Sequence, residues 1–557
     1  MIRPTFQAFE TAKRALNVSQ AGLDAVGNNI ANVNTPGYTR QRVDQVSLHS
    51  TYRNKFQIHG ARGQTVGLGA DIAGINQVRD PYLDTRYRNE AASNGELAVK
   101  SGGLTDLQSV LDEIDTSGLS DMLGGFINEI TKFAANADSE ELAVVVRNAA
   151  QKVTQVLNKN AGELATVMDQ QLFDLDVAIS DEVNSTLERI SFLNQRIRED
   201  NMYGNPSNEL NDERNTLIDQ LANYLPIRVT RTPEQISENI SVERVSIQLM
   251  SSNGGVVSDF NLVDNDRFNQ LGLTQNEDGS VGISLNEGST GFPIVDDITD
   301  KICSGGIKGF IDIINGKGDF AGEGENTFRG VSYYQKSLDV FASTFAKLMN
   351  AANSVTADEA DGKTYVEEYQ NKNLFAPSDG SAEITAANIT ISGEWREDSF
   401  FLTTSKYDPK DPEYELDSDG NIKYDSVTKE PIYKTTANND NLLVFKALLT
   451  DSNKAFTGVN GDGTSFTLFQ GSFEEALVST QSTLGMDKSL NDSLSKASDL
   501  VISGYSDSRD AISAVSVDEE AINMLTYQNY YNAAARYMTT LDEALGTIIE
   551  KMGIVGR

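Results

Sequence analysis

Two seven-residue repeats at opposite ends of the chain restrict its fold more than any other feature. Apolar and small residues follow a 3-4-3-4 spacing over residues 9–33, and two rows of seven-residue spacing occupy 517–552 and 527–555. This spacing is typical of helices with a narrow apolar seam. A short helix cannot bury such a seam alone, so the ends need each other or neighbouring molecules. The positions predicted to make these contacts are Phe9, Leu16, Leu23, Val26, Ile30, Tyr531, Met538, Leu541, Leu545 and Met552.

The charges of the two ends favour contact between them. Residues 1–60 carry seven Lys and Arg against three Asp and Glu, whereas residues 517–557 carry three against six. Their net charges therefore have opposite signs, which suits pairing. Pairing within one chain and pairing between molecules both remain open. Only Glu520 interrupts the second C-terminal row, one heptad before Tyr527.

Between the ends, helical patterns give way to alternating ones and then return. No proline occurs between residues 82 and 205, and proline-free stretches are candidates for long helices. Asp80-Pro81 is typical of an N-cap followed by a first-turn proline. A long helix is expected over about 139–200. From Pro226 onward the apolar residues alternate with polar ones, which predicts strands.

The predicted fold class is α+β and multidomain, with terminal coiled-coil helices, a long-helix bundle and inserted β-rich outer domains. The four predicted domains are a terminal helical assembly domain, a helical bundle, a β-rich insertion and a second small insertion. The terminal domain covers residues 1–75 plus 515–557, and the helical bundle covers 76–225 plus 306–358 plus 441–514. The β-rich insertion covers residues 226–305, and the second small insertion covers 359–440.

The composition excludes several classes of function. A net charge of −35 would repel nucleic-acid phosphates. No segment approaches the ~18 apolar residues that cross a membrane, and no cleavable signal peptide is expected. One cysteine, Cys303, and two histidines, His49 and His59, leave little material for zinc binding or nucleophilic catalysis. No catalytic, cofactor or metal-binding residues are therefore assigned.

Two local features are explained without a binding site. Residues 417–421 suggest a calcium loop, but Ser426 stands where the loop needs a bidentate Glu, so a polar turn is favoured. Trp395, the only tryptophan, is expected to pack inside the outer domain rather than to form a sugar platform.

The most specific stretch is residues 27–40, GNNIANVNTPGYTR. Its asparagines can cap backbone groups where the first helix ends, and a Pro-Gly turn follows. The stretch closely resembles the segment after the N-terminal helix in the flagellar rod, hook and hook-associated proteins. Residues 517–535, VDEEAINMLTYQNYYNAAA, resemble the matching C-terminal end of that family. The motif positions are Asn28, Asn29, Asn32, Thr35, Pro36, Gly37 and Tyr38.

Within the family, the middle of the chain resembles the hook-associated branch. The helical stretch after residues 80–84 and the return at 305–310 differ from the hook protein, whose middle is mostly β. The resemblance implies a structural, non-enzymatic subunit at the junction of hook and filament, outside the cell and exported unfolded without a cleaved signal. It also implies partners: further copies of the chain, the hook protein, a second hook-associated protein, and an export chaperone at the C-terminal helix.

Two alternatives remain. The chain could be another axial protein, of the hook or the distal rod, and its position along the flagellum would distinguish that case. It could instead be a secreted adhesin or enzyme that carries its activity on the outer domains. Deletion of residues 226–305 would then abolish binding or activity but leave motility intact.

Overall fold

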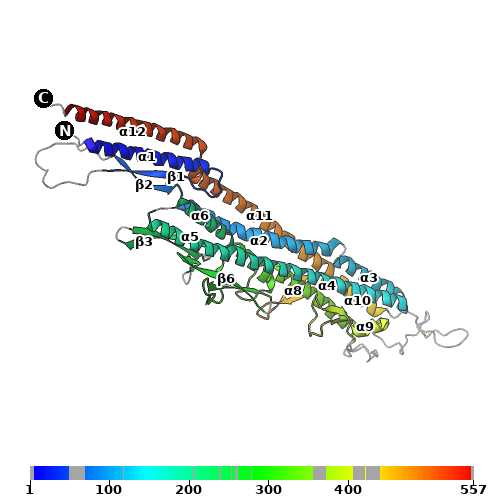
Figure 1. The fold of residues 1–557 in the computed structure, drawn as a ribbon. Helices are drawn as coiled ribbons and strands as arrows, with labels where there is room; N and C mark the ends of the chain where they lie inside the picture. Colours follow the sequence, from blue (N-terminus) through cyan, green and yellow to red (C-terminus); the bar gives the residue numbers. More distant parts are fainter. Residues whose placement is uncertain are drawn as a thin grey trace.

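The computed structural model describes residues 5–48, 69–116, 118–204, 207–237, 240–251, 254–257, 261–276, 279–354, 372–405, 421 and 439–552. The molecule is elongated, and the two ends of the chain lie side by side at one tip (Figure 1). There, α1 (Thr5–Ala31) runs along α12 (Val517–Met552), and an antiparallel hairpin of β1 (Gln41–Ser47) and β2 (Ala70–Gln77) packs against α1. The two terminal heptad segments therefore pair within one chain.

A layer of long helices extends from this tip. Helix α11 leaves the terminal pair and runs along α2, while α3 and α10 lie at the far end (Figure 1). Their apolar faces form one continuous core. The helices of this layer are α2 (Pro81–Thr116), α3 (Leu119–Ala135), α4 (Glu140–Val177), α5 (Ser185–Met202), α6 (Asn208–Tyr224), α7 (Gly306–Asn315), α8 (Val331–Asn353), α10 (Asp440–Thr450) and α11 (Phe473–Ser513).

Helices α4 and α5 are one helical rod joined by a π-helical turn, Ala178–Asn184. This turn contacts the insertion that follows α6. The side-chain amide of Asn184 donates to the carbonyl of Leu271 at 2.9 Å and accepts from the Leu271 N–H at 2.8 Å. It thus pairs with the backbone as a neighbouring strand would.

The insertion is a six-stranded antiparallel sheet in which every strand pairs with its neighbours in sequence. Alternate residues face the core: Val245, Ile247 and Leu249 are buried, as are Val281, Ile283 and Leu285. The strands are β3 (Ile227–Ser237), β4 (Ile240–Leu249), β5 (Val263–Asp264), β6 (Arg267–Gln275), β7 (Val281–Glu287) and β8 (Pro293–Val295).

The second insertion is smaller in its described part. It has a two-stranded sheet of β9 (Phe375–Pro377) and β10 (Ile389–Ile391), followed by α9 (Gly393–Glu397). Trp395 is fully buried and packs edge-on against Phe375, with ring centroids 5.8 Å apart. The tryptophan is therefore a core residue, in agreement with the sequence-based interpretation.

The α+β class is confirmed. Two hairpins lie in ranges that the sequence analysis assigned to helical domains: β1–β2, and between α10 and α11 the hairpin of β11 (Ala455–Val459) and β12 (Ser465–Gln470). His49, His59 and residues 417–420 of the calcium-loop candidate lie outside the described residues. None of the described helices is both long and apolar enough to span a bilayer.

Candidate assembly site at the paired chain ends

The contact between α1 and α12 is built from small residues. Gly22 lies against the ring of Tyr527, so that a Cβ placed on Gly22 would come within 2.5 Å of the Tyr527 Cδ1 atom. The α1 backbone can approach the Tyr527 ring this closely because position 22 has no side chain. The buried row of α1 is Ala8, Ala12, Ser19, Gly22, Val26 and Asn29.

The large apolar residues predicted as the seam lie beside this row. Of the predicted residues on α1, only Val26 is buried, whereas Phe9, Leu16, Leu23 and Ile30 are half-buried. On α12, Met538, Leu541 and Leu545 are half-buried, Tyr531 is exposed, and Met552 is the last residue of the helix. Pairing within one chain thus leaves much of the apolar surface of both helices accessible.

Asn29 is the hub that ties the two ends together. Its side chain is buried, and its amide nitrogen donates to the carbonyl of Gln41 at 2.9 Å and to Glu520 Oε2 at 3.1 Å. Its amide oxygen accepts from the Tyr38 hydroxyl and from the Gln41 N–H, both at 2.9 Å. All four hydrogen-bonding sites of the amide are used. One side chain therefore joins α1, β1, α12 and the segment between α1 and β1, residues 32–40, which we call the motif loop.

Glu520 corrects the interpretation drawn from the heptad pattern. It does not interrupt the C-terminal row, because its side chain is only 1% exposed and occupies the buried position itself. Its charge is compensated by Arg40, whose Nε donates to Glu520 Oε1 at 2.8 Å, while Nη1 reaches Glu519 at 2.8 Å. Both carboxylates also lie in the first turn of α12, where the helix dipole favours negative charge.

The motif loop after α1 is fixed by its own side chains and by α6. Asn32 donates to the carbonyl of Asn28 at 3.0 Å, and Thr35 donates to Asn32 at 3.2 Å. Gly37 has a φ of +78°, and a Cβ there would meet the Thr216 hydroxyl at 2.4 Å. This position therefore requires glycine for both its backbone conformation and its contact. Two motif residues complete the arrangement: Asn28 reaches Glu209 at 3.3 Å, and Pro36 is exposed.

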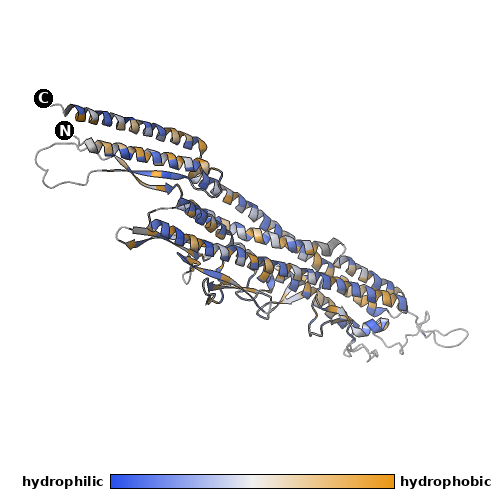
Figure 2. Cartoon of the chain, viewed as in Figure 1, coloured by the Kyte–Doolittle hydropathy of each residue, from blue (hydrophilic) through white to orange (hydrophobic). Residues whose placement is uncertain are grey.

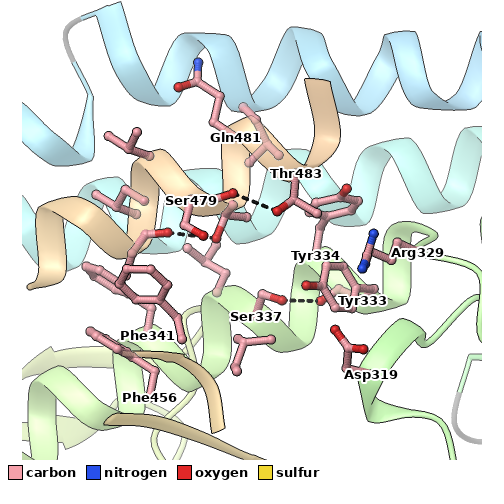
Figure 3. Close-up of a pocket in the computed structure, with 18 of the residues that line it drawn as sticks. Asp319, Arg329, Tyr333, Tyr334, Ser337, Phe341, Phe456, Ser479, Gln481 and Thr483 are labelled. Atoms are coloured by element: carbon pink, nitrogen blue, oxygen red, sulfur yellow. Dashed lines mark hydrogen bonds between the residues drawn. The ribbon is translucent and has the colours of Figure 1, made fainter. Parts of the chain in front are cut away.

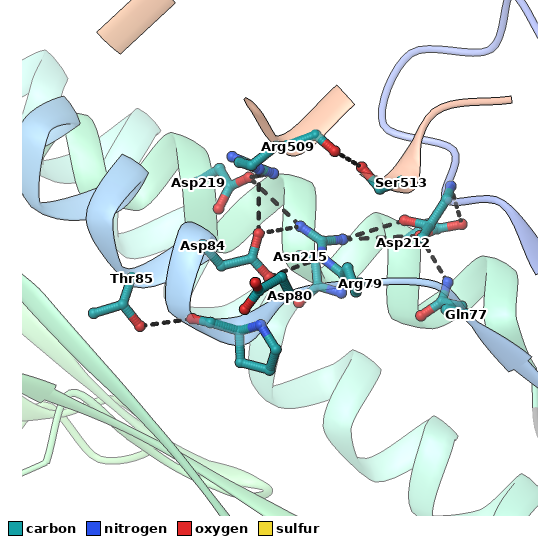
Figure 4. Close-up of polar contacts among 12 residues, drawn as sticks. Gln77, Arg79, Asp80, Asp84, Thr85, Asp212, Asn215, Asp219, Arg509 and Ser513 are labelled. Carbon is teal, nitrogen blue, oxygen red and sulfur yellow. Dashed lines mark hydrogen bonds and ion pairs between the residues drawn. The ribbon is translucent and has the colours of Figure 1, made fainter. Parts of the chain in front are cut away.

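A cluster of Arg and Asp side chains joins the terminal pair to the helical layer (Figure 4). Arg79 forms two hydrogen bonds with Asp84, at 2.9 and 3.2 Å. Asp219 of α6 accepts from Arg88 at 2.6 Å and from Arg509 of α11 at 2.7 Å. Since α2, α6 and α11 each contribute a charged partner, the cluster locks three helices at the base of the terminal pair.

Asp212 connects this cluster to the motif loop. Its carboxylate accepts from the Thr39 N–H at 3.1 Å and from the Gln77 side chain at 2.7 Å. The site thus forms a chain of polar contacts from α12 through the motif loop to α6.

Burial and charge shift several pKa values here. Burial, together with the negative charges of Glu209, Asp212 and Glu520, raises the pKa of Tyr38 to about 12. Burial also raises the pKa of Asp212. Burial acts in the same direction on Asp84, but the hydrogen bonds and charge of Arg79 outweigh it and lower the pKa of Asp84.

The contacts of this site hold separate parts of the chain together. Within the described ranges, no group of three or more His, Cys, Asp or Glu side chains is arranged to hold a metal ion. The sequence reasoning found the motif residues but missed Arg40, Glu520, Arg79 and Asp212 as their partners. The only available signal was the pair of opposite net charges at the two ends.

Comparison with known families identifies the chain. The model described as "Flagellar hook-associated protein FlgK helical domain" matches residues 104–365. Two further models match the ends: "Flagella basal body rod protein" at 9–39 and "Flagellar basal body rod FlgEFG protein C-terminal" at 509–551. Flagellar hook-associated protein 1 of Bacillus subtilis (strain 168) is 29% identical, over 99% of each chain. The chain therefore resembles the flagellar hook-associated protein 1 family along its whole length.

Other members agree with this assignment. Flagellar hook-associated protein 1 of Escherichia coli (strain K12) is 23% identical, over 97% of this chain and 98% of its own length. The solved structure of the flagellar hook junction protein FlgK from Burkholderia pseudomallei has the same fold. It aligns with a TM-score of 0.52 and 12% identity, over 78% of this chain and 100% of that one. The two end models coincide with the paired helices and the motif loop, which places the hub around Asn29 in the part shared with rod and hook proteins.

Proposed function

We propose that this hook-associated protein 1 forms the junction between hook and filament, and that the outward faces of its terminal helices are its lattice contacts. One observation carries the proposal. Ile522 and Leu525 of α12 are 64% and 61% exposed, on a helix whose inner row already packs against α1. Apolar side chains this exposed on a paired helix are typical of an interaction surface.

A second exposed row continues this surface along α11. Met486, Leu490, Leu494 and Leu500 are each about half exposed or more, on the helix that leads directly into α12. Figure 2 shows apolar residues recurring along α1, α11 and α12 between hydrophilic ones. A neighbouring copy that covers α12 therefore finds further apolar surface on the adjoining helix.

Burial of these side chains between subunits favours assembly. Full burial of one Leu or Ile side chain contributes about 1.5–3 kcal/mol relative to its exposed state. Ile522 and Leu525 together then contribute several kcal/mol for each subunit, and the contact recurs at every lattice position. The small-residue seam keeps α1 and α12 close, so that their large side chains remain available to neighbours.

The proposal includes partners and location. The neighbours are further copies of this chain, the hook protein on one side and a second hook-associated protein on the other. Before export, a flagellar chaperone covers the C-terminal helix, whose apolar surface would otherwise be exposed to water. The chain leaves the cell through the flagellar export channel without a cleaved signal peptide. The names of the relatives and the exposed α12 surface support this assignment.

Charge substitution on α12 tests the lattice contact. In Leu525→Asp the protein should fold and be exported, but should not be incorporated into flagella, and cells should lose swimming motility. Asn128→Asp adds the same charge at an exposed polar position of α3, at the far end of the helical layer, and should support normal swimming. Normal motility of the Leu525→Asp strain would overturn the proposed contact.

Imaging tests the location separately. Fluorescent labelling of a cysteine introduced at the exposed position Asp121 should give one focus at each boundary between hook and filament. Label along the whole hook, or at its base, would assign the chain to the hook or the distal rod.

A further inference from the structure

The outer side of α11 carries an apolar stripe that its own chain leaves uncovered. The first turns of the helix are covered, because residues 476–483 line a cleft with α8 and the β11–β12 hairpin (Figure 3). The later turns pack against α2 on one side. On the other side Leu490, Leu494 and Val501 are exposed, and their spacing of four and seven residues places them on one face of the helix.

This stripe leads to an arginine held between two tyrosines. The guanidinium carbon of Arg86, on α2, lies 5.1 Å from the centroid of the Tyr82 ring and 5.5 Å from that of Tyr505. Tyr505 follows Val501 by one turn of α11, and Tyr82 is exposed. Contact with two rings restrains the guanidinium before any partner binds. We call Tyr82, Arg86, Val501 and Tyr505 the Arg86 patch.

The charge of Arg86 is not matched within the chain. Its neighbours Arg88 and Arg509 bind Asp219, at 2.6 and 2.7 Å. Among the described residues, no carboxylate lies within ion-pair distance of Arg86, which is exposed. Arg and Tyr are also the residue types that dominate the centres of protein interfaces. The Arg86 patch therefore fits a partner surface that combines a carboxylate with apolar side chains.

Helix α12 carries such a surface. Asp518, Ile522 and Leu525 are exposed, and their spacing of four and three residues places them on one face. Glu520 faces Asn29 of α1, and residues two positions apart in a helix point in nearly opposite directions. Asp518 and Ile522 therefore point away from α1. In the part of the chain that the structure describes, no basic side chain pairs with Asp518.

We propose that the face of α12 with Asp518, Ile522 and Leu525 binds the Arg86 patch of a second copy of this chain. Asp518 would pair with the guanidinium, and the two apolar side chains would cover Val501 and the tyrosine rings. The inference rests on the proposed lattice contact of α12 and names the surface that receives it. Because the two surfaces differ, a copy that binds through α12 keeps its own Arg86 patch free, so the contact can repeat in one direction.

A charge exchange tests the pairing in cells. Arg86→Glu and Asp518→Arg each bring like charges together and should lower the amount of the chain in isolated flagella about tenfold or more. The double variant restores opposite charges in every contact and should recover about half or more of the native amount. As a control, Lys152→Glu inverts an exposed charge on α4 and should assemble normally. Normal assembly of either single variant, or no recovery in the double variant, would overturn the pairing.

Photo-cross-linking identifies the occupant of the Arg86 patch. With p-benzoylphenylalanine in place of Tyr82, irradiation of assembled flagella should link the chain to a second copy. The link should lie in the tryptic peptide 510–536, which contains the first turns of α12. The same replacement at Tyr203, an exposed tyrosine after α5, should not give this link. No link from position 82, or links only to a different protein, would show that the proposed occupant is wrong.

The two proposals on α12 fail in different ways. If Leu525→Asp abolishes incorporation but position 82 gives no link to residues 510–536, α12 is a lattice contact and another surface receives it. If cells with Leu525→Asp swim normally, the α12 contact itself is wrong.

Discussion

Asn29 and Glu520, which are 491 positions apart in the sequence, share a buried hydrogen bond of 3.1 Å. One residue belongs to the last turns of α1, and the other to the first turn of α12. Arg40 binds the second oxygen of the same carboxylate at 2.8 Å, so the two chain ends and the motif loop meet at the Glu520 carboxylate. The orientation of the terminal helix pair relative to the helical layer therefore depends on very few side chains.

Loss of the Asn29 amide should loosen the terminal pair selectively. Asn29→Ala leaves the Glu520 carboxylate, the Tyr38 hydroxyl and backbone groups of Gln41 without their partner, and each unsatisfied buried group costs about 1–3 kcal/mol. Hydrogen exchange should accelerate at least tenfold in α12, with α4 unchanged. The control Asn28→Ala removes two side-chain hydrogen bonds that do not involve α12, one to Glu209 at 3.3 Å and one from Asn32 at 2.8 Å, and should have a smaller effect on α12. Equal protection of α12 in both variants would contradict the role of Asn29 as a hub.

Two glycines of α1 should respond to alanine in opposite ways. Gly22→Ala places a Cβ about 2.5 Å from the Tyr527 ring, so the helices must separate and the terminal pair should lose stability. Gly27→Ala meets no atom within 4 Å and should stabilise α1 by about 0.5–1 kcal/mol through helix propensity. The effects of both substitutions can be measured by thermal unfolding, monitored through hydrogen exchange in α1 and α12. If Gly22→Ala instead stabilised the terminal pair, the contact between α1 and α12 would have space for a Cβ and the prediction would be wrong.

Alkaline pH should release the motif loop. The folded-state pKa of Tyr38, about 12, lies above the usual value near 10. The protonated hydroxyl therefore contributes stability that is fully present below pH 10 and is lost as the pH rises toward 12. Protection of α12 should fall over this interval in the native chain. In Tyr38→Phe, α12 should be less protected at neutral pH, and the loss between pH 10 and 12 should be smaller. An unchanged alkaline transition would assign it to other groups.

The π-helical turn should be needed for the stability of the β-rich insertion. Asn184→Ala leaves both backbone groups of Leu271 unmatched, a cost of about 1–3 kcal/mol for each buried group. Hydrogen exchange of β6 should accelerate more than that of α4. Asp181→Ala, at an exposed position of the same turn, should leave β6 as protected as in the native chain. Identical exchange in the two variants would contradict the role of Asn184.

Local sequence signals predicted much of the secondary structure. Helix α2 begins at Pro81, and Asp80 accepts from the Tyr82 N–H at 2.9 Å, as the Asp80-Pro81 pair indicates. The alternating runs at Val245 and Val281 are buried strands. Helix α1 ends at Ala31, within the Asn-rich motif and directly before Asn32. These features depend on neighbours within a few residues, so that a pattern along the chain is sufficient to find them.

Contacts between distant segments could not be predicted in the same way. The predicted heptad row contained Ala12, Ser19 and Val26, which are buried. It also contained Phe9, Leu16 and Leu23, which are only half-buried, and it omitted Gly22 and Asn29, which are buried, because close helix approach selects for small size rather than for apolar character. The burial of Glu520 depends on partners almost five hundred residues away. The β11–β12 hairpin was missed even though its turn, residues 460–463, reads Asn-Gly-Asp-Gly, which is a hairpin signal.

The π-helical turn at Ala178–Asn184 also determines how a change in the number of residues would affect the helices on either side of it. Each residue of an α-helix rotates the chain by about 100°, and a π-helical turn holds one residue more than the α-helical path would. Removal of a single residue from this turn would therefore convert it into regular α-helix and leave the later side chains of α5 on their present faces. The same deletion within α4 would swing every later side chain about a quarter-turn around the axis, and the face of α5 that carries Leu187, Ile190 and Leu193 would be directed away from the sheet it covers. A one-codon deletion should therefore be tolerated better within this segment than in the regular helix before it.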